Sequence, residues 1–174
     1  LMNWAGDFTE AGHRALHKRL FEELEERINE PLAVAFDIFS RHNFAWREYI
    51  NNQELIVHRK GATPVNHGQY AVIPATMGNN TQIVLGLGNE QALNSAPHGS
   101  GRRFSRGAAL QQFKETQQFV LKEYGVTLIG GGEDEDPRAY KDINEVIEAQ
   151  KSCSISIGEF TPRVVRMAAP RLYR

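Results

Sequence analysis

The sequence lacks several features that would assign it to a special class of protein. It holds a single cysteine, Cys153, in 174 residues, so no disulfide can form within one chain, and we expect a reducing, cytoplasmic location. It has no run of about 18 apolar residues, the length that a membrane-spanning helix needs. Its first residues, Leu1–Trp4, have neither the basic nor the apolar region of a signal peptide. We therefore expect no membrane partner.

Excess charge of one sign is also absent. The 20 Lys and Arg residues nearly balance the 21 Asp and Glu residues, for a formal net charge of -1, so bulk charge does not indicate nucleic-acid binding. Charge is concentrated locally instead. Arg102, Arg103 and Arg106 cluster beside a histidine, and an acidic run spans Glu133–Asp136. We interpret the acidic run as a solvated loop. Length and a 41% hydrophobic share predict a single domain over residues 1–174.

The longest periodic stretch predicts an amphipathic helix over residues 4–28. Its apolar residues recur at spacings of four and eight and are expected to share a face: Trp4, Phe8, Leu16, Leu20, Leu24 and Ile28. Pro31 ends the helix because proline cannot continue the hydrogen-bond ladder. The helix begins almost at residue 1 without a clear cap, so we expect the chain to be incomplete at its N-terminus.

Shorter patterns predict an α+β fold in the remainder. We expect strands over 55–57, 70–73, 82–85 and 126–129, helices over 104–124 and 143–151, and an extended segment over 155–167 interrupted by Gly158 and Pro162. Asp142 is the expected cap of the second of these helices.

The segment from Gly86 to Arg106 is the part of the sequence richest in candidate chemistry. His98 stands between Pro97 and Gly99, so it is displayed on a turn rather than on an apolar face. Glycines let the backbone approach a phosphate closely, and arginines bind phosphate through a planar fork of donors. Ser105 is a candidate cap for the helix that follows. On these residues alone, a phosphate site with a reactive histidine and a structural or merely exposed histidine both remain open.

Six stretches together resemble one family. They occur in the order found in RtcB RNA ligases: His42–Trp46, His58–Thr63, Ile73–Gly78, Ser95–Arg102, Ala139–Ile143 and Phe160–Arg163. The resemblance runs from about Trp4 to Met167. It implies an RtcB-like fold of mixed sheets with packed helices. It also implies an enzyme that joins RNA 3′-phosphate or 2′,3′-cyclic phosphate ends to 5′-hydroxyl ends, in transfer RNA splicing or RNA repair, with GTP and Mn²⁺ as cofactors.

The resemblance also assigns roles to individual residues. His98 matches the histidine that becomes guanylylated, and His42 matches a manganese ligand. The residues that match nucleotide contacts are His42, Asn43, Pro74, Ala75, Thr76, Met77, Thr81, His98, Gly99, Ser100, Gly101 and Tyr140. Arg102 and Arg103 are candidates for RNA phosphate, chiefly because arginine suits phosphate.

The family's other metal ligands lie in an N-terminal half that this sequence does not contain. We therefore expect a missing N-terminal half as a partner, beside RNA and GTP. The alternative function is a nucleotide- or RNA-end-binding fragment, or a partner subunit, that does not ligate. A third idea is a regulatory partner of a full-length ligase.

Overall fold

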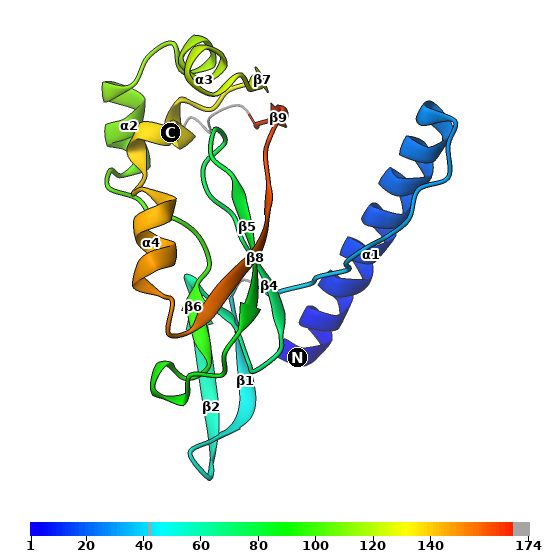
Figure 1. The fold of residues 1–174 in the computed structure, drawn as a ribbon, viewed down its shortest axis with the longest axis vertical. Coiled ribbons are helices and arrows are strands. Elements are labelled where there is room, and N and C mark those ends of the chain that lie inside the picture. The colour runs from blue at the N-terminus through cyan, green and yellow to red at the C-terminus, as the bar shows by residue number, and fades with distance from the viewer. Residues whose placement is uncertain (42, 169–174) are drawn as a thin grey trace.

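A computed structural model of the chain describes residues 1–41 and 43–168 and has the expected α+β character (Figure 1). The helices are α1 (Met2–Ile28), α2 (Arg106–Gln112), α3 (Thr116–Tyr124) and α4 (Ile143–Ala149). The strands are β1 (Asn43–Ile50), β2 (Gln53–Lys60), β3 (Ala62–Pro64), β4 (Tyr70–Ile73), β5 (Thr81–Gly86), β6 (Ser95–Pro97), β7 (Thr127–Ile129), β8 (Ser154–Phe160) and β9 (Val164–Arg166). Short 3₁₀ turns are η1 (Glu90–Ala92), η2 (Glu133–Glu135) and η3 (Pro137–Ala139).

Helix α1 confirms the long predicted helix and stands apart from the strands, at the right of Figure 1. It ends at Asn29, whose left-handed backbone lets its N–H donate to the Glu25 carbonyl. Gly6 is the one buried residue of α1, because the Arg41 guanidinium lies against it. The predicted single apolar face needs correction, since each step of four residues turns about 40° past a full turn. The apolar row therefore winds around the helix.

A central antiparallel sheet joins the strands in the order β4-β5-β8. The predicted strands 70–73 and 82–85 are confirmed as β4 and β5. One face of this sheet is buried in a core made of Val65, Ala71, Ile73, Val84, Ala96, Ile143 and Cys153. Gly86 lies so close to the backbone of Val65 and Asn66 that a Cβ there would sit 2.3 Å from the Asn66 oxygen. The opposite face of the sheet is largely open.

The first hairpin pairs β1 with β2 in antiparallel register. The predicted strand 55–57 is confirmed within β2, but the sequence patterns did not predict β1. Asn51 and Asn52 connect the two strands with positive φ angles of 50° and 59°. A two-residue connection with both φ values positive is a common hairpin turn, and asparagine tolerates it.

The predicted helix over 104–124 is wrong in one respect, because the structure divides it into α2 and α3. The backbone of Phe113 is extended, and Glu115 adopts a positive φ of 57°, which no right-handed helix can contain. The predicted caps are confirmed: the Ser105 hydroxyl accepts from the N–H of Ala108, and the Asp142 carboxylate accepts from that of Asn144.

The last predicted segments form a second small core. Strand β7 confirms the strand expected over 126–129 and pairs in parallel with β9. Pro162 separates β8 from β9 as predicted, whereas Gly158 does not interrupt β8 and lies opposite a register shift at Ile83 and Val84. Met77, Val120, Val126 and Leu128 are buried together here. Within the described ranges, no helix has the length and apolarity to cross a membrane.

Candidate active site

His98 follows β6, and the short β3-β6 pair fixes its backbone. Ala62 is the register partner of Pro97, and the N–H of His98 donates to the carbonyl of Gly61 at 3.3 Å. A Cβ placed on Gly61 would lie 4.0 Å from Nε2 of His98, so the imidazole lies alongside this glycine. Gly61 has a positive φ of 74°, which glycine adopts without steric cost. Strands β3 and β6, which are distant in sequence, thereby position His98, and its side chain is half-buried.

The three residues after His98 run close to the turn that follows β4. A Cβ on Gly99 would lie 3.1 Å from the carbonyl oxygen of Pro74, so the two backbones nearly touch. Ser100 is only 4% exposed, and its hydroxyl has no hydrogen-bond partner among the described residues. A buried hydroxyl without a partner is uncommon in native structures and marks a group available to a ligand or water. The N–H of Lys141 donates to the carbonyl of Gly101 at 3.0 Å.

A pocket of about 330 Å³ lies beside this turn and gathers several of the predicted nucleotide contacts. Pro74 to Met77, Thr81 and Tyr140 all line it, and their contact with a nucleotide stays a prediction. It is also lined by Asn79, Glu135, Phe160, Pro162, Val165 and Met167, which the sequence patterns did not single out as site residues. Its walls combine two aromatic rings and apolar side chains with a few polar groups, as small-molecule sites do. His98 and residues 99–101 are not part of this lining.

The hydroxyl of Thr76 stabilises the turn that forms one wall of the pocket. It donates to the side-chain oxygen of Asn79 at 2.5 Å and accepts from the N–H of Gly78 at 3.3 Å. A Cβ on Gly78 would come within 2.5 Å of the Tyr124 ring. Met77 points inward and is 8% exposed. The turn is therefore fixed from both sides.

Tyr140 is held at the pocket by Arg102. The two residues form an isolated β-bridge, and Nη1 of Arg102 donates to the Tyr140 hydroxyl at 2.8 Å. The guanidinium also lies over the Tyr140 ring at 4.8 Å and pairs with Glu135 at 3.1 Å. The Tyr140 hydroxyl donates to the same Glu135 carboxylate. Arg102 is thus turned into the protein, whereas Arg103 is 54% exposed and lies 3.8 Å from Glu145. Their contact with RNA phosphate stays a prediction.

The acidic run Glu133–Asp136 is not the solvated loop that its composition suggested. Asp136 is fully buried, and its carboxylate accepts from the guanidinium of Arg138 and, at 2.7 Å, from the hydroxyl of Thr116. Burial raises the pKa of Asp136, but hydrogen bonds from Arg138 and Thr116 together outweigh it and lower that pKa below its ordinary value. Arg106 pairs with Asp134 at 2.8 Å, a hydrogen bond that raises the pKa of Arg106. Arg138 nearby and the distant Arg102 and Arg106 balance the charge of this run, which buries Asp136 and partly buries the other three residues.

The two remaining predicted residues, His42 and Asn43, are adjacent in the sequence. His42, the proposed manganese ligand, lies outside the described residues. Asn43 is exposed at the start of β1, opposite Lys60 and therefore one residue from the Gly61 turn beside His98. It lines a hollow at the base of α1 and not the Pro74–Tyr140 pocket. The structure thus gives three neighbouring parts: the histidine turn, the pocket and the start of β1.

The described residues do not offer a complete metal site. Residues 1–41 and 43–168 contain no group of three or more His, Cys, Asp or Glu side chains that could hold a metal ion. Manganese in proteins is ordinarily held by several carboxylate or imidazole ligands. The donor set in this part of the chain therefore does not fit a resident Mn²⁺.

Comparison with known proteins identifies the family. A family model described as "tRNA-splicing ligase RtcB" matches residues 1–166. RNA-splicing ligase RtcB of Escherichia coli K12 is 35% identical over 154 residues, covering 84% of this chain and 38% of that protein. The Mycobacterium tuberculosis RtcB is 32% identical over 84% of this chain and 40% of its own length. The Nanoarchaeum equitans tRNA-splicing ligase RtcB is 30% identical over 85% and 36%.

This chain therefore spans two fifths or less of the length of these three relatives. The family match nevertheless extends over almost the whole chain, and it includes the β6 turn with His98 and the pocket with Tyr140. The chain belongs to the RtcB family of tRNA-splicing ligases.

Proposed function

We propose that this chain carries the guanylyl-accepting part of an RNA ligase. The complete reaction joins RNA 3′-phosphate or 2′,3′-cyclic phosphate ends to 5′-hydroxyl ends, in transfer RNA splicing or in repair of broken RNA. The relatives' names support RNA ligation at the level of the family. GTP as the nucleotide donor, Mn²⁺ as the metal and a cytoplasmic location belong to the same proposal.

The proposed chemistry is nucleophilic catalysis by His98. An imidazole nitrogen attacks the α-phosphorus of GTP, the bond to the β-phosphate oxygen breaks, and pyrophosphate leaves as the ring loses its N–H proton. A 2′,3′-cyclic phosphate end is first opened by water to a 3′-phosphate and a 2′-hydroxyl. An RNA 3′-phosphate oxygen next attacks the phosphorus of the histidine-bound GMP, the N–P bond breaks, and the imidazole regains its proton. The RNA 5′-hydroxyl then attacks the activated 3′-phosphate, loses its proton and releases GMP. Mn²⁺ would neutralise phosphate charge, and no step here depends on ligands from the described residues.

The observation that supports this proposal best is the placement of His98 beside exposed backbone and an unpartnered hydroxyl. The imidazole lies alongside Gly61, and the next residues bring Gly99 against Pro74. The buried Ser100 hydroxyl has no partner among the described residues and suits a phosphate oxygen. The adjoining pocket, with the Tyr140 ring on its wall, suits a planar base. The proposal assigns the nucleophile to His98, a phosphate contact to Ser100 and the base to this pocket.

Intact-mass measurement after incubation with GTP and Mn²⁺ tests the role of His98. We expect the parent chain to gain the mass of one GMP and the His98→Ala variant to gain none. His58→Ala is the matched control, because His58 is an exposed histidine on β2, and it should gain the adduct like the parent. An adduct that persists in His98→Ala would contradict the assignment. Absence of an adduct in the parent would contradict guanylylation by this chain alone.

A second candidate function is nucleotide binding without transfer, and the incomplete metal donor set favours it. Calorimetric titration with GMP separates the two candidates. Binding of GMP together with no mass gain from GTP supports the non-ligating alternative, whereas a mass gain that needs His98 excludes it.

A further inference from the structure

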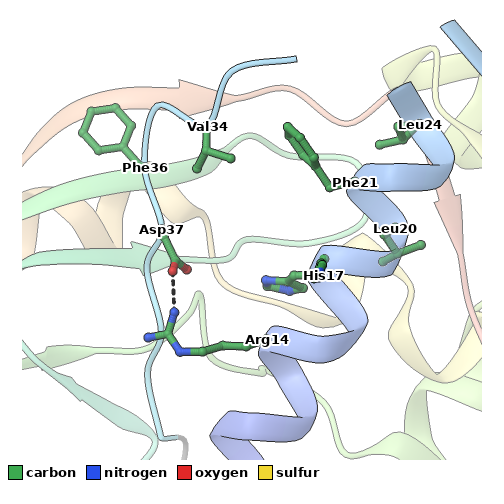
Figure 2. A pocket seen from close by; sticks show the side chains of 9 residues that line it. Arg14, His17, Leu20, Phe21, Leu24, Val34, Phe36 and Asp37 are labelled. Atoms are coloured by element: carbon green, nitrogen blue, oxygen red, sulfur yellow. Dashed lines mark hydrogen bonds and ion pairs between the residues drawn. The ribbon is translucent and has the colours of Figure 1, made fainter. Parts of the chain in front are cut away.

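Arg59 is a buried arginine on β2, and arginine is almost never buried unless it is paired. Its two Nη atoms donate to the carboxylate of Glu48 on β1 at 2.6 and 2.7 Å, and its guanidinium lies 5.0 Å from the Trp46 ring. Figure 2 shows a contrasting pair, Arg14 of α1 with Asp37, in which both side chains are 54% exposed. Solvent screens that pair, whereas the Arg59 side chain is 1% exposed and is held in one place.

The guanidinium of Arg59 also binds the loop that leads into β6. Its Nε donates to the Ser95 hydroxyl and its Nη2 donates to the Leu93 carbonyl, each at 2.8 Å. The Ser95 hydroxyl donates in turn to the same Leu93 carbonyl at 2.8 Å. Leu93 and Asn94 have positive φ angles of 51° and 47°, a backbone conformation that persists in such residues only where their surroundings hold it. Arg59 and Ser95 supply these holding contacts.

These contacts join the same two segments that meet at His98. Arg59 lies two residues before Gly61, and Ser95 lies three residues before His98. The N–H of His98 donates to the Gly61 carbonyl at 3.3 Å, which joins the segments at one end, and the hydrogen bond from Arg59 to Ser95 joins them at the other. The β3-β6 pair between them is short, with three residues on each strand. The position of the imidazole is therefore tied to the Arg59 guanidinium.

We propose that Arg59 is a positioning residue for His98. It holds β6 through the Ser95 hydroxyl, and this keeps the imidazole in the orientation from which its nitrogen attacks the α-phosphorus of GTP. Arg59 acts only through β6, because a side chain that is 1% exposed has no surface for a nucleotide or an RNA phosphate. The inference rests on the proposed function for the reaction, but the orientation of His98 can be measured without any nucleotide.

Nuclear magnetic resonance of the full chain, without nucleotide, tests the inference directly. Ser95→Ala removes the acceptor of the Arg59 Nε and leaves the pair with Glu48 in place. We expect the His98 N–H to exchange about tenfold faster, as loss of one hydrogen bond from a charged group implies, and the imidazole ring signals to shift. Arg59→Lys should act in the same direction, because an ammonium group cannot form the planar fork. Ser95→Thr keeps the hydroxyl and should restore the parent values.

Arg47→Lys is the matched control for Arg59→Lys. Arg47 pairs with Glu54 at 2.8 Å in the same hairpin, but these side chains are 75% and 54% exposed, so the variant should leave His98 unchanged. Guanylylation, followed by intact mass at several GTP concentrations with Mn²⁺, gives a second readout. Ser95→Ala should lower its maximal rate about tenfold. The GTP concentration that gives half the maximal rate should stay the same, because the Pro74–Tyr140 pocket is untouched.

Each contrary outcome overturns the inference in a recognisable way. Ser95→Ala with lower stability in urea but parent-like His98 signals assigns the Arg59 contacts a purely structural role. An equal change in Arg47→Lys shows that His98 responds to any loss in the hairpin. A higher half-maximal GTP concentration at an unchanged maximal rate makes Arg59 a determinant of nucleotide binding instead. Altered His98 signals in Ser95→Ala, together with no GMP gain in the parent, retain the inference and contradict the proposed function.

Discussion

Helix α1 and the region from β1 to β9 show two different ways in which this sequence specifies structure. In α1 the backbone satisfies its own hydrogen bonds, so the helix forms although only Gly6 is buried. In the β region every strand depends on a partner strand, and the pairs β3–β6, β5–β8 and β7–β9 join segments distant in sequence. Residues such as Ile73 and Val84 are fully buried there. The first region is locally determined and exposes apolar surface, whereas the second is determined by long-range packing. Changes placed in each region should therefore have different consequences.

The largest effect is expected from adding a methyl group at Gly86. A Cβ there would meet the backbone of Val65 and Asn66 at 2.3 to 2.5 Å, and backbone cannot rotate away as a side chain can. We expect Gly86→Ala to lower the free energy of unfolding by about 3 kcal/mol. Urea denaturation followed by circular dichroism measures it. A loss below about 1 kcal/mol would show that the strand region tolerates local shifts.

Removing the buried charge of Asp136 should have the next largest effect. Its carboxylate accepts hydrogen bonds from Arg138 and Thr116, so Asp136→Asn should lower the free energy of unfolding by about 2 kcal/mol. Glu123→Gln removes an exposed charge from α3 and should have almost no effect. Equal losses in both variants would mean that the ion pair with Arg138 adds nothing.

The Asp136 carboxylate also predicts how the stability of the fold depends on pH. Burial, the largest single influence, raises the pKa of Asp136, but the hydrogen bonds from Arg138 and Thr116 together outweigh it, so the net folded-state pKa lies below the ordinary value. The stabilisation is then fully present above the unfolded-state pKa of about 4 and is lost as pH falls through the folded-state pKa. Urea midpoints measured below about pH 4 should decline less in Asp136→Asn than in the parent.

In α1 a glycine-to-alanine substitution should stabilise the structure, whereas Gly86→Ala should destabilise it. A Cβ on Gly12 would meet no atom within 4 Å, and alanine favours a helix over glycine by about 1 kcal/mol. We expect Gly12→Ala to raise the helical signal of α1 in circular dichroism and to slow its hydrogen exchange. A decrease would indicate that α1 owes its form to contacts rather than to its own backbone.

The smallest effect is expected from truncating an exposed apolar residue of α1. Leu20→Ala in the isolated chain should change the free energy of unfolding by less than about 0.5 kcal/mol. Val84→Ala removes a buried side chain of β5 and should cost about 2 kcal/mol. Similar losses in the two variants would remove the distinction between the regions.

Prediction from sequence succeeded where structure is set locally. The four-residue spacing from Leu16 to Ile28 predicted α1, and Ser105 and Asp142 were recognised as caps from residue type and position. It failed at Glu115, whose positive φ divides α2 from α3. Strand β1 was missed because residues 44–50 do not alternate apolar and polar side chains, although the strand pairs with the adjacent β2. Apolar periodicity thus predicted helix α1, but it did not predict where α2 ends and α3 begins or which strands pair.

The candidate site divides in the same way. Pro74 to Met77 and Tyr140 were predicted from resemblance and do line one pocket. Glu135 was assigned to a solvated loop because its partner Arg102 lies 33 positions away in the sequence. Composition identifies charged residues but not which opposite charge the fold brings to them. Resemblance supplied those site residues because it carries information about the fold.

Backbone hydrogen bonds on either side of Arg102 determine where this chain can accept an inserted peptide. The N–H of Arg103 donates to the Ala139 carbonyl, and the N–H of Lys141 donates to the Gly101 carbonyl. These backbone hydrogen bonds hold the two ends of segment 105–138 next to each other. Doubling the length of such an excursion costs only about 0.6 kcal/mol in closure entropy. A peptide inserted after Lys114, in the exposed connection between α2 and α3, should leave His98 undisturbed. The connection after Lys114 is thus a place where a reporter can be introduced without altering the histidine turn.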